Sequence, residues 1–182
     1  MTILRENTKA YHVNDEYRCR RFVEDSNYII ESDDTWWLGK GMYFWDNKGN
    51  ANYWLAEKKR KNSNEKYIKT KSNLYIDEDI LLDLTDDEVL NLLMQLWKEY
   101  CKREKCKIKQ PLGVRLDKLF DFFDEELSEL KVIKGTGYYD NKFNNNKFLV
   151  FDKRYPNICS GVKNIYCAKS PEMIVNRTIE ED

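Results

Sequence analysis

The chain has 182 residues, and its 31 Lys and Arg residues nearly balance its 32 Asp and Glu residues. That length fits one domain with a sizeable core, and an aromatic content of 14% argues against intrinsic disorder. The near-neutral charge disfavours nucleic-acid binding through bulk charge but leaves a local basic face open. The longest apolar runs are too short to cross a bilayer, and the first residues turn charged and polar at once. We therefore expect a cytoplasmic protein that does not bind a membrane.

The first third of the chain predicts short elements of both kinds, separated by turn residues. A glycine pair breaks the chain before a β-type run, and an asparagine N-cap opens a helix after it. The expected elements, in chain order, are strand character at Ala10–Val13, a helix over Asp15–Val23, a strand or turn edge at Tyr28–Ser32, the break Gly39-Lys40-Gly41, a strand at Met42–Trp45, and a helix from Asn50 to about Lys61.

Two longer helices are predicted in the middle of the chain. Thr85 and Glu88 have the spacing of a capping box, with Thr85 as the N-cap, directly before an apolar helical stripe. A second stripe of period 3.6 runs from Leu116 to Leu130, and the two helices look like a packed pair. Strand character returns at Lys131–Lys134, Phe148–Phe151 and Asn164–Ala168. Strands that flank helices without regular βαβ alternation predict an α+β domain with an antiparallel or mixed sheet.

The cysteines and the single histidine argue against a metal centre. Five scattered cysteines are an odd number, and the first residues lead us to expect no secretion signal, so a disulfide framework is not expected either. Four tetrahedral ligands are hard to assemble from one histidine and one close cysteine pair, Cys101 and Cys106. Taken alone, the only histidine, His12, fits a satisfied structural histidine better than a functional one.

The segment Trp36–Asp46 is the most informative part of the chain. Two glycines flanking Lys40 permit a sharp turn and a close approach of the backbone to a ligand. The spacing is neither that of a Walker A loop nor G-x-G-x-x-G, so a phosphate loop is not indicated. Aromatic residues just past the turn fit a stacking wall for a flat ring and a core strand equally well.

This segment, Gly39-Lys40-Gly41-Met42-Tyr43-Phe44 followed by Ala51-Asn52-Tyr53, resembles the second catalytic motif of the diphtheria-toxin-like poly- and mono-ADP-ribosyltransferases. That motif reads G-K-G-[IM]-Y-F, with A-N-Y about ten residues later. In the family, a histidine on the first strand precedes this motif, and His12 lies at the matching place. A third strand near the C-terminus carries a glutamate or another polar residue, and Asn164–Ala168 is similar to it.

The resemblance implies one ADP-ribosyltransferase-like domain over residues 1–182, with a split antiparallel or mixed sheet and a helical insertion at about residues 77–130. NAD is the implied substrate, and no metal is implied. His12 would hydrogen-bond a ribose hydroxyl, while Tyr43 and Tyr53 would hold the nicotinamide ring between them. Trp54 would share the second wall, because the spacing is one residue short. The rest of the implied cofactor site is Gly41, the backbone at Val13, and Asn50 in place of a common serine.

Asn164 is the largest departure, since it matches the catalytic glutamate or glutamine of the family. With His12 and Tyr43 it completes the implied catalytic set. An amide can bind a ribose hydroxyl, but it cannot act as a base or place a full negative charge there. The resemblance therefore implies a mono-ADP-ribosyltransferase rather than a polymerase.

A small enzyme of this kind resembles a bacterial toxin or phage-defence effector, whose partners are a macromolecular acceptor (protein or nucleic acid) and an antitoxin. Two alternatives stay open. One is an NAD glycohydrolase, which uses water as the acceptor; the other is an inactive module that binds NAD or ADP-ribose. The basic run Lys58–Lys61 is either a solvated helix end or a charge that holds the diphosphate or a nucleic-acid acceptor.

Overall fold

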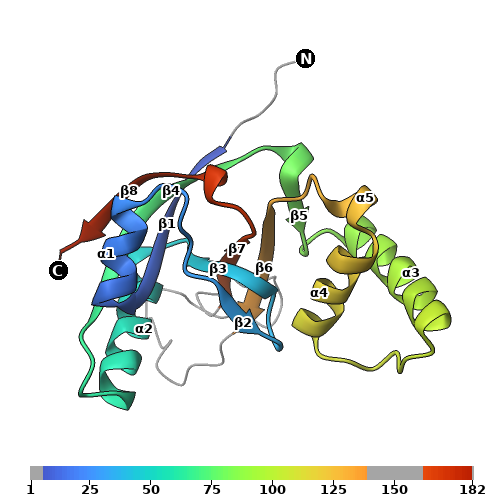
Figure 1. Ribbon diagram of the computed structural model, residues 1–182, viewed down its shortest axis with the longest axis horizontal. Helices are drawn as coiled ribbons and strands as arrows, with labels where there is room; N and C mark the ends of the chain where they lie inside the picture. The colour runs from blue at the N-terminus through green and yellow to red at the C-terminus, as the bar shows by residue number, and fades with distance from the viewer. Residues whose placement is uncertain (1–5, 139–161, 182) are drawn as a thin grey trace, which may run out of the picture.

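The computed structural model describes residues 6–138 and 162–181, which form a mixed sheet with helices packed around it (Figure 1). The strands are β1 (Glu6–Asp15), β2 (Ser32–Asp34), β3 (Gly39–Trp45), β4 (Tyr67–Ile76), β5 (Leu81–Asp83), β6 (Val132–Tyr138), β7 (Val162–Ala168) and β8 (Ile174–Glu180). The α-helices are α1 (Glu16–Glu24), α2 (Lys48–Lys61), α3 (Asp87–Glu104), α4 (Leu112–Phe122) and α5 (Asp124–Leu127). Two 3₁₀ turns cover Glu78–Ile80 and Pro171–Met173.

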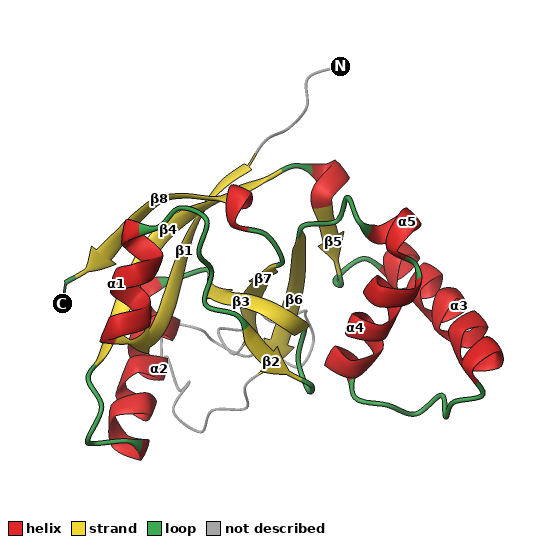
Figure 2. Cartoon of the chain, in the orientation of Figure 1, coloured by secondary structure: helices red, strands yellow, loops and turns green. Residues whose placement is uncertain are grey.

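The sheet has the order β5-β6-β7-β3-β1-β4-β8, with β2 paired to β3 outside this path. The pair β5–β6 is parallel, and the other described pairs are antiparallel. The expected mixed sheet with flanking helices is therefore confirmed. The central strands β7, β3 and β1 are neighbours in space although they come from opposite ends of the chain (Figure 2).

The sheet is split between β1 and β3. All residues of β1 pair with β4, whereas β1 and β3 share a single paired position, Tyr11 with Trp45. Beyond this pair β1 and β3 diverge, and a hydrogen bond from the side chain of His12 to the backbone of Tyr43 replaces backbone pairing. A split of this kind leaves room for a ligand at the centre of the sheet.

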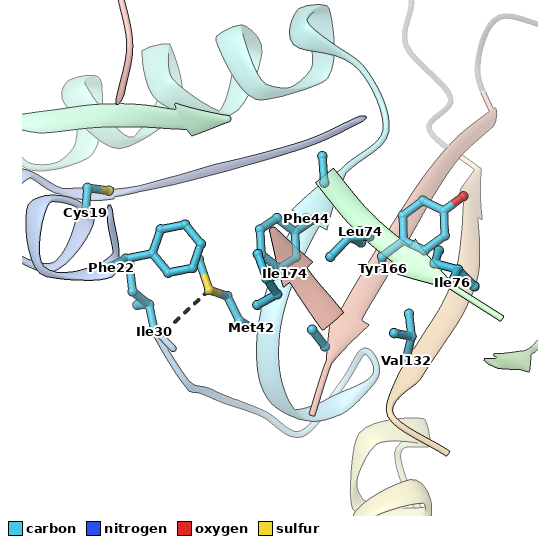
Figure 3. Packing of buried hydrophobic residues seen from close by; sticks show 12 residues of the cluster. Cys19, Phe22, Ile30, Met42, Phe44, Leu74, Ile76, Val132, Tyr166 and Ile174 are labelled. Atoms are coloured by element: carbon cyan, nitrogen blue, oxygen red, sulfur yellow. Dashed lines mark hydrogen bonds between the residues drawn. The ribbon is translucent and has the colours of Figure 1, made fainter. Parts of the chain in front are cut away.

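Side chains alternate across the strands and fill separate cores on the two faces. On one face, Met42 and Phe44 of β3 pack with Phe22 of α1 and Tyr166 of β7 (Figure 3). On the other face, Tyr11 and Val13 of β1 pack under α2, and a third cluster joins β6 and β7 to α3 and α4. Figure 1 shows α3, α4 and α5 together at the β5 end of the sheet, away from α1 and α2.

Two predicted helix starts are wrong, because in each case a local hydrogen bond makes another residue the N-cap. The cap of α2 is Asn47, whose side chain accepts from the backbone N–H of Asn50, so the helix begins at Lys48 and Asn50 lies inside it. The cap of α3 is Asp86 rather than Thr85. The hydroxyl and backbone N–H of Thr85 both donate to Asp83, which holds Thr85 in the turn after β5. Asp is also the stronger N-cap residue of the two.

The remaining differences concern the bounds of elements. The helix predicted over Leu116–Leu130 is two helices, α4 and α5, because Phe123 leaves the helical region with φ −109° and ψ 44°. Of the segment Tyr28–Ser32, predicted as a strand or turn edge, only Ser32 is in a strand. The predicted strand Phe148–Phe151 lies outside the described residues. None of the described helices is long and apolar enough to cross a membrane.

Candidate functional site

A cavity of about 330 Å³ lies at the split between β1 and β3. Both strands contribute to its wall, together with α2, β7 and the chain around β2. The lining residues are His12, Val13, Asn14, Ile30, Ser32, Asp34, Trp37, Tyr43, Phe44, Trp45, Trp54, Lys58 and Ile165. Its volume is at the lower end of the range for small-molecule sites, about 300–1,000 Å³. Six of these residues carry aromatic rings, the imidazole of His12 included, and such a lining suits a flat ligand.

His12 is a neutral, fixed imidazole in this wall. Its Nδ1 lies 2.6 Å from the carbonyl oxygen of Tyr43, and since a carbonyl only accepts, Nδ1 carries the proton. Nε2 therefore has the lone pair, which accepts from the side-chain amide of Asn14 at 3.3 Å. Burial lowers the pKa of His12 to about 4, and the nearby charge of Lys58 acts in the same direction. A ribose hydroxyl would thus meet an acceptor at Nε2.

Tyr43 is a rigid wall of the cavity, because its hydroxyl is held at both ends of a turn. The hydroxyl donates to the carbonyl oxygen of Gly39 at 2.8 Å and accepts from the N–H of Leu38 at 2.9 Å. Gly39 has φ +75°, a conformation that glycine adopts at little cost. Burial raises the pKa of Tyr43, so the phenol stays protonated. The ring is oriented before any ligand arrives.

The second aromatic wall comes from Trp54 instead of Tyr53. Trp54 lines the cavity, where its ring centroid is 6.3 Å from that of Trp45. Tyr53 is 52% exposed and lies under the amine of Lys163, 5.5 Å from its ring centroid. Ala51 of α2 is buried against β1, and this fixes the rotation of the helix. Trp54 and Lys58 are four residues apart on the helix and therefore share the face toward the cavity.

Gly41 and Asn50 have local structural roles outside the cavity lining. At Gly41 a Cβ would lie 2.6 Å from Sγ of Cys167 and 2.7 Å from the carbonyl oxygen of Ala168, so glycine is needed for the close approach of β3 to β7. The side-chain amide of Asn50 donates to Oδ1 of Asp46 at 3.4 Å. Neither residue is among those that line the cavity.

Asn164 lies beside the cavity, in a row of polar side chains that crosses three strands. Its Oδ1 accepts from the hydroxyl of Thr136 on β6 at 3.1 Å, and its Nδ2 donates to Oδ2 of Asp46 at 3.0 Å. The next residue, Ile165, pairs with Trp45, and both line the cavity. Asp46 also accepts from Asn47 at 2.8 Å. The sequence analysis missed this carboxylate, which directly follows β3.

Of the residues implied by the resemblance, those that line one cavity are His12, Val13, Tyr43 and Trp54, while those that do not are Gly41, Asn50, Tyr53 and Asn164. The described residues contain no group of three or more His, Cys, Asp or Glu side chains that could hold a metal ion. Comparisons with protein-family models, curated proteins and solved structures find no match to this chain. The function is therefore inferred from the chemistry of the cavity.

Proposed function

We propose that the chain binds NAD in the cavity between β1 and β3 and transfers a single ADP-ribose to a macromolecule, releasing nicotinamide. The observation that carries the proposal is that His12 and Tyr43, from two separate sequence motifs, line one aromatic cavity and are linked by a hydrogen bond. The third motif residue, Asn164, is on the strand next to that of Tyr43. This adjacency of β3 and β7 supports the proposal.

In this proposal the aromatic residues bind the nicotinamide ring. Tyr43 and Trp54 offer ring faces from different elements, β3 and α2, and offset stacking adds to the burial of a flat ring. The strands diverge after the Tyr11–Trp45 pair, which leaves space for the carboxamide beside the β1 backbone at Val13. Nε2 of the neutral His12 accepts a hydrogen bond from a ribose hydroxyl, which replaces the bond from the side-chain amide of Asn14.

The reaction breaks the bond between the ribose C1′ and the nicotinamide nitrogen. Nicotinamide leaves with the bonding electron pair, and the ribose carries positive charge in the transition state. The acceptor nucleophile then bonds to C1′ and loses its proton to water. A charge of opposite sign near the ribose stabilises this transition state. In this proposal Asn164 supplies an amide near the ribose, and its hydrogen bond to the carboxylate of Asp46 orients that amide.

The test is incubation with NAD labelled in its adenylate group, with and without a bacterial lysate. We expect nicotinamide release together with a labelled macromolecule, and separate protease and nuclease treatment then identifies the acceptor as protein or nucleic acid. Nicotinamide release without label would favour a glycohydrolase, and affinity without release would favour a binding module. The absence of both NAD binding and nicotinamide release would refute the proposal.

The biological setting follows the same proposal. A cytoplasmic transferase that modifies a host macromolecule would act as a toxin or phage-defence effector, and an antitoxin protein would then hold it inactive. Expression of the chain in a bacterial host measures this directly. We expect growth arrest that Tyr43→Ala relieves, and no arrest would contradict the toxin role.

A further inference from the structure

Lys58 gives the aromatic cavity a positive charge. It is on α2, one helical turn after Trp54, and among the described residues that line the cavity it is the one that carries a positive charge at neutral pH. The neutral His12 does not add to it. The cavity therefore combines ring faces with a single cation on the same wall.

The amine of Lys58 has aromatic neighbours but no acid partner in the described part of the chain. It lies 5.7 Å from the ring centroid of Trp54 and 5.9 Å from that of Tyr67. Within residues 6–138 and 162–181, no carboxylate lies within 4 Å of it. Contacts with ring faces leave the N–H donors of the ammonium available to an anion.

Asp34 is the acidic residue among the described lining residues, and its carboxylate already has hydrogen-bond partners. The carboxylate of Asp34 accepts from the backbone N–H groups of Trp36 at 2.8 Å and Trp37 at 3.1 Å, which fixes it in the turn before β3. Asp34 therefore holds the turn that places Trp37 in the wall. Asp34 keeps its negative charge but is tied to this turn, so Lys58 is the positive charge that a ligand can meet among the described lining residues.

We infer that Lys58 binds a phosphate group, so that the ligand of this cavity is a nucleoside diphosphate or a dinucleotide rather than a neutral aromatic molecule. This inference rests on the proposed function for the identity of the ligand, but the combination of ring faces and one cation defines the ligand class by itself. Trp54 and Lys58 are about one helical turn apart on α2, so we expect a phosphate that is joined through a sugar to a ring stacked on Trp54 to reach Lys58. A charge-assisted hydrogen bond to phosphate then anchors the polar end of the ligand.

The experiment is a calorimetric titration of three proteins with ADP, NAD and nicotinamide. The proteins are the wild type, Lys58→Gln and the matched control Lys59→Gln, which removes an equal charge one residue along α2. Lys59 is exposed and does not line this cavity. Lys58→Gln should weaken ADP and NAD binding about ten-fold, because a charged donor is replaced by a neutral one. Nicotinamide affinity should stay unchanged, and Lys59→Gln should behave like the wild type.

Each other outcome is decisive. Wild-type affinity of Lys58→Gln for ADP and NAD would overturn the inference, and so would an equal loss of nicotinamide binding, which would indicate a structural role. A wild type that binds nicotinamide but neither phosphate-bearing ligand would overturn it as well. ADP binding that depends on Lys58, in a protein that does not cleave NAD, would keep the inference and refute the proposed transferase. Thermal melting of each variant checks that its fold is intact.

Discussion

The hydroxyl and the ring of Tyr43 have separate tasks, and two substitutions separate them. Tyr43→Phe removes the hydroxyl that bridges the carbonyl oxygen of Gly39 and the N–H of Leu38. Each hydrogen bond contributes about 0.5–1.5 kcal/mol, so the loss of both lowers the free energy of unfolding by about 1–3 kcal/mol. For a chain of this size, each kcal/mol shifts the melting temperature by roughly 2–4 °C.

Binding should respond differently from stability. Tyr43→Phe keeps the ring, so its affinity for NAD should fall little once the folded fraction is taken into account. Tyr43→Ala also removes one face of the clamp, which should weaken NAD binding by about 1–3 kcal/mol from burial and stacking together. Thermal melting and calorimetry on both variants give the two quantities independently. If Tyr43→Ala binds NAD as tightly as Tyr43→Phe, the ring is not part of the nicotinamide site.

Three further predictions concern pH, the third motif and the β8 edge. The pKa of His12 is about 4 when folded and about 6.5 when unfolded, so the unfolded state binds more protons between these values. Acidification from about pH 7.5 to about pH 5 should therefore cost the wild type about 2 kcal/mol more stability than His12→Gln in denaturant titrations. Asn164→Ala should slow nicotinamide release roughly ten-fold. Asp46→Asn should also slow nicotinamide release, while NAD affinity stays unchanged. Wild-type release rates in both variants would exclude Asn164 and Asp46 from the reaction. The guanidinium of Arg177 donates to carbonyl oxygens of α1 and the following turn. Arg177→Met should lower the free energy of unfolding by about 2–4 kcal/mol, and an unchanged urea midpoint would contradict this.

Elements with strong local signals could be predicted from the sequence. The helix α1, the strand character of β1, and the runs at Met42–Trp45 and Asn164–Ala168 agree with the structure to within a few residues. The sequence analysis missed the strand β4, because its lysines are expected to be exposed and one of them is buried. Lys69 is 1% exposed, since its amine donates to Asn52 while its apolar stem packs inside. A hydropathy pattern counts such a lysine as exposed and hides the alternation of the strand.

Which aromatic residue reaches the cavity depends on helix rotation, and a sequence motif specifies that rotation poorly. The N-cap of α2 is Asn47, three residues before the predicted cap Asn50, and its side chain accepts from the N–H of Asn50. Successive residues are about 100° apart around a helix, so Tyr53 and Trp54 cannot both face the same wall. The burial of Ala51 and Leu55 against β1 selects Trp54. Tertiary packing decided this point.

The Asp46–Asn164 contact lies beyond any sequence pattern, because its residues are 118 positions apart and meet through strand register alone. The pairing of Trp45 with Ile165 brings Asp46, which directly follows β3, next to Asn164 of β7, and the pairing of Asn164 with Thr136 extends the row onto β6. An amide that donates to a carboxylate is polarised, and its oxygen becomes a stronger acceptor. The contact with Asp46 therefore strengthens Oδ1 of Asn164 as an acceptor, here of the hydroxyl of Thr136. In the proposed transferase, this pair would take the place of the single glutamate in the family that the motifs resemble.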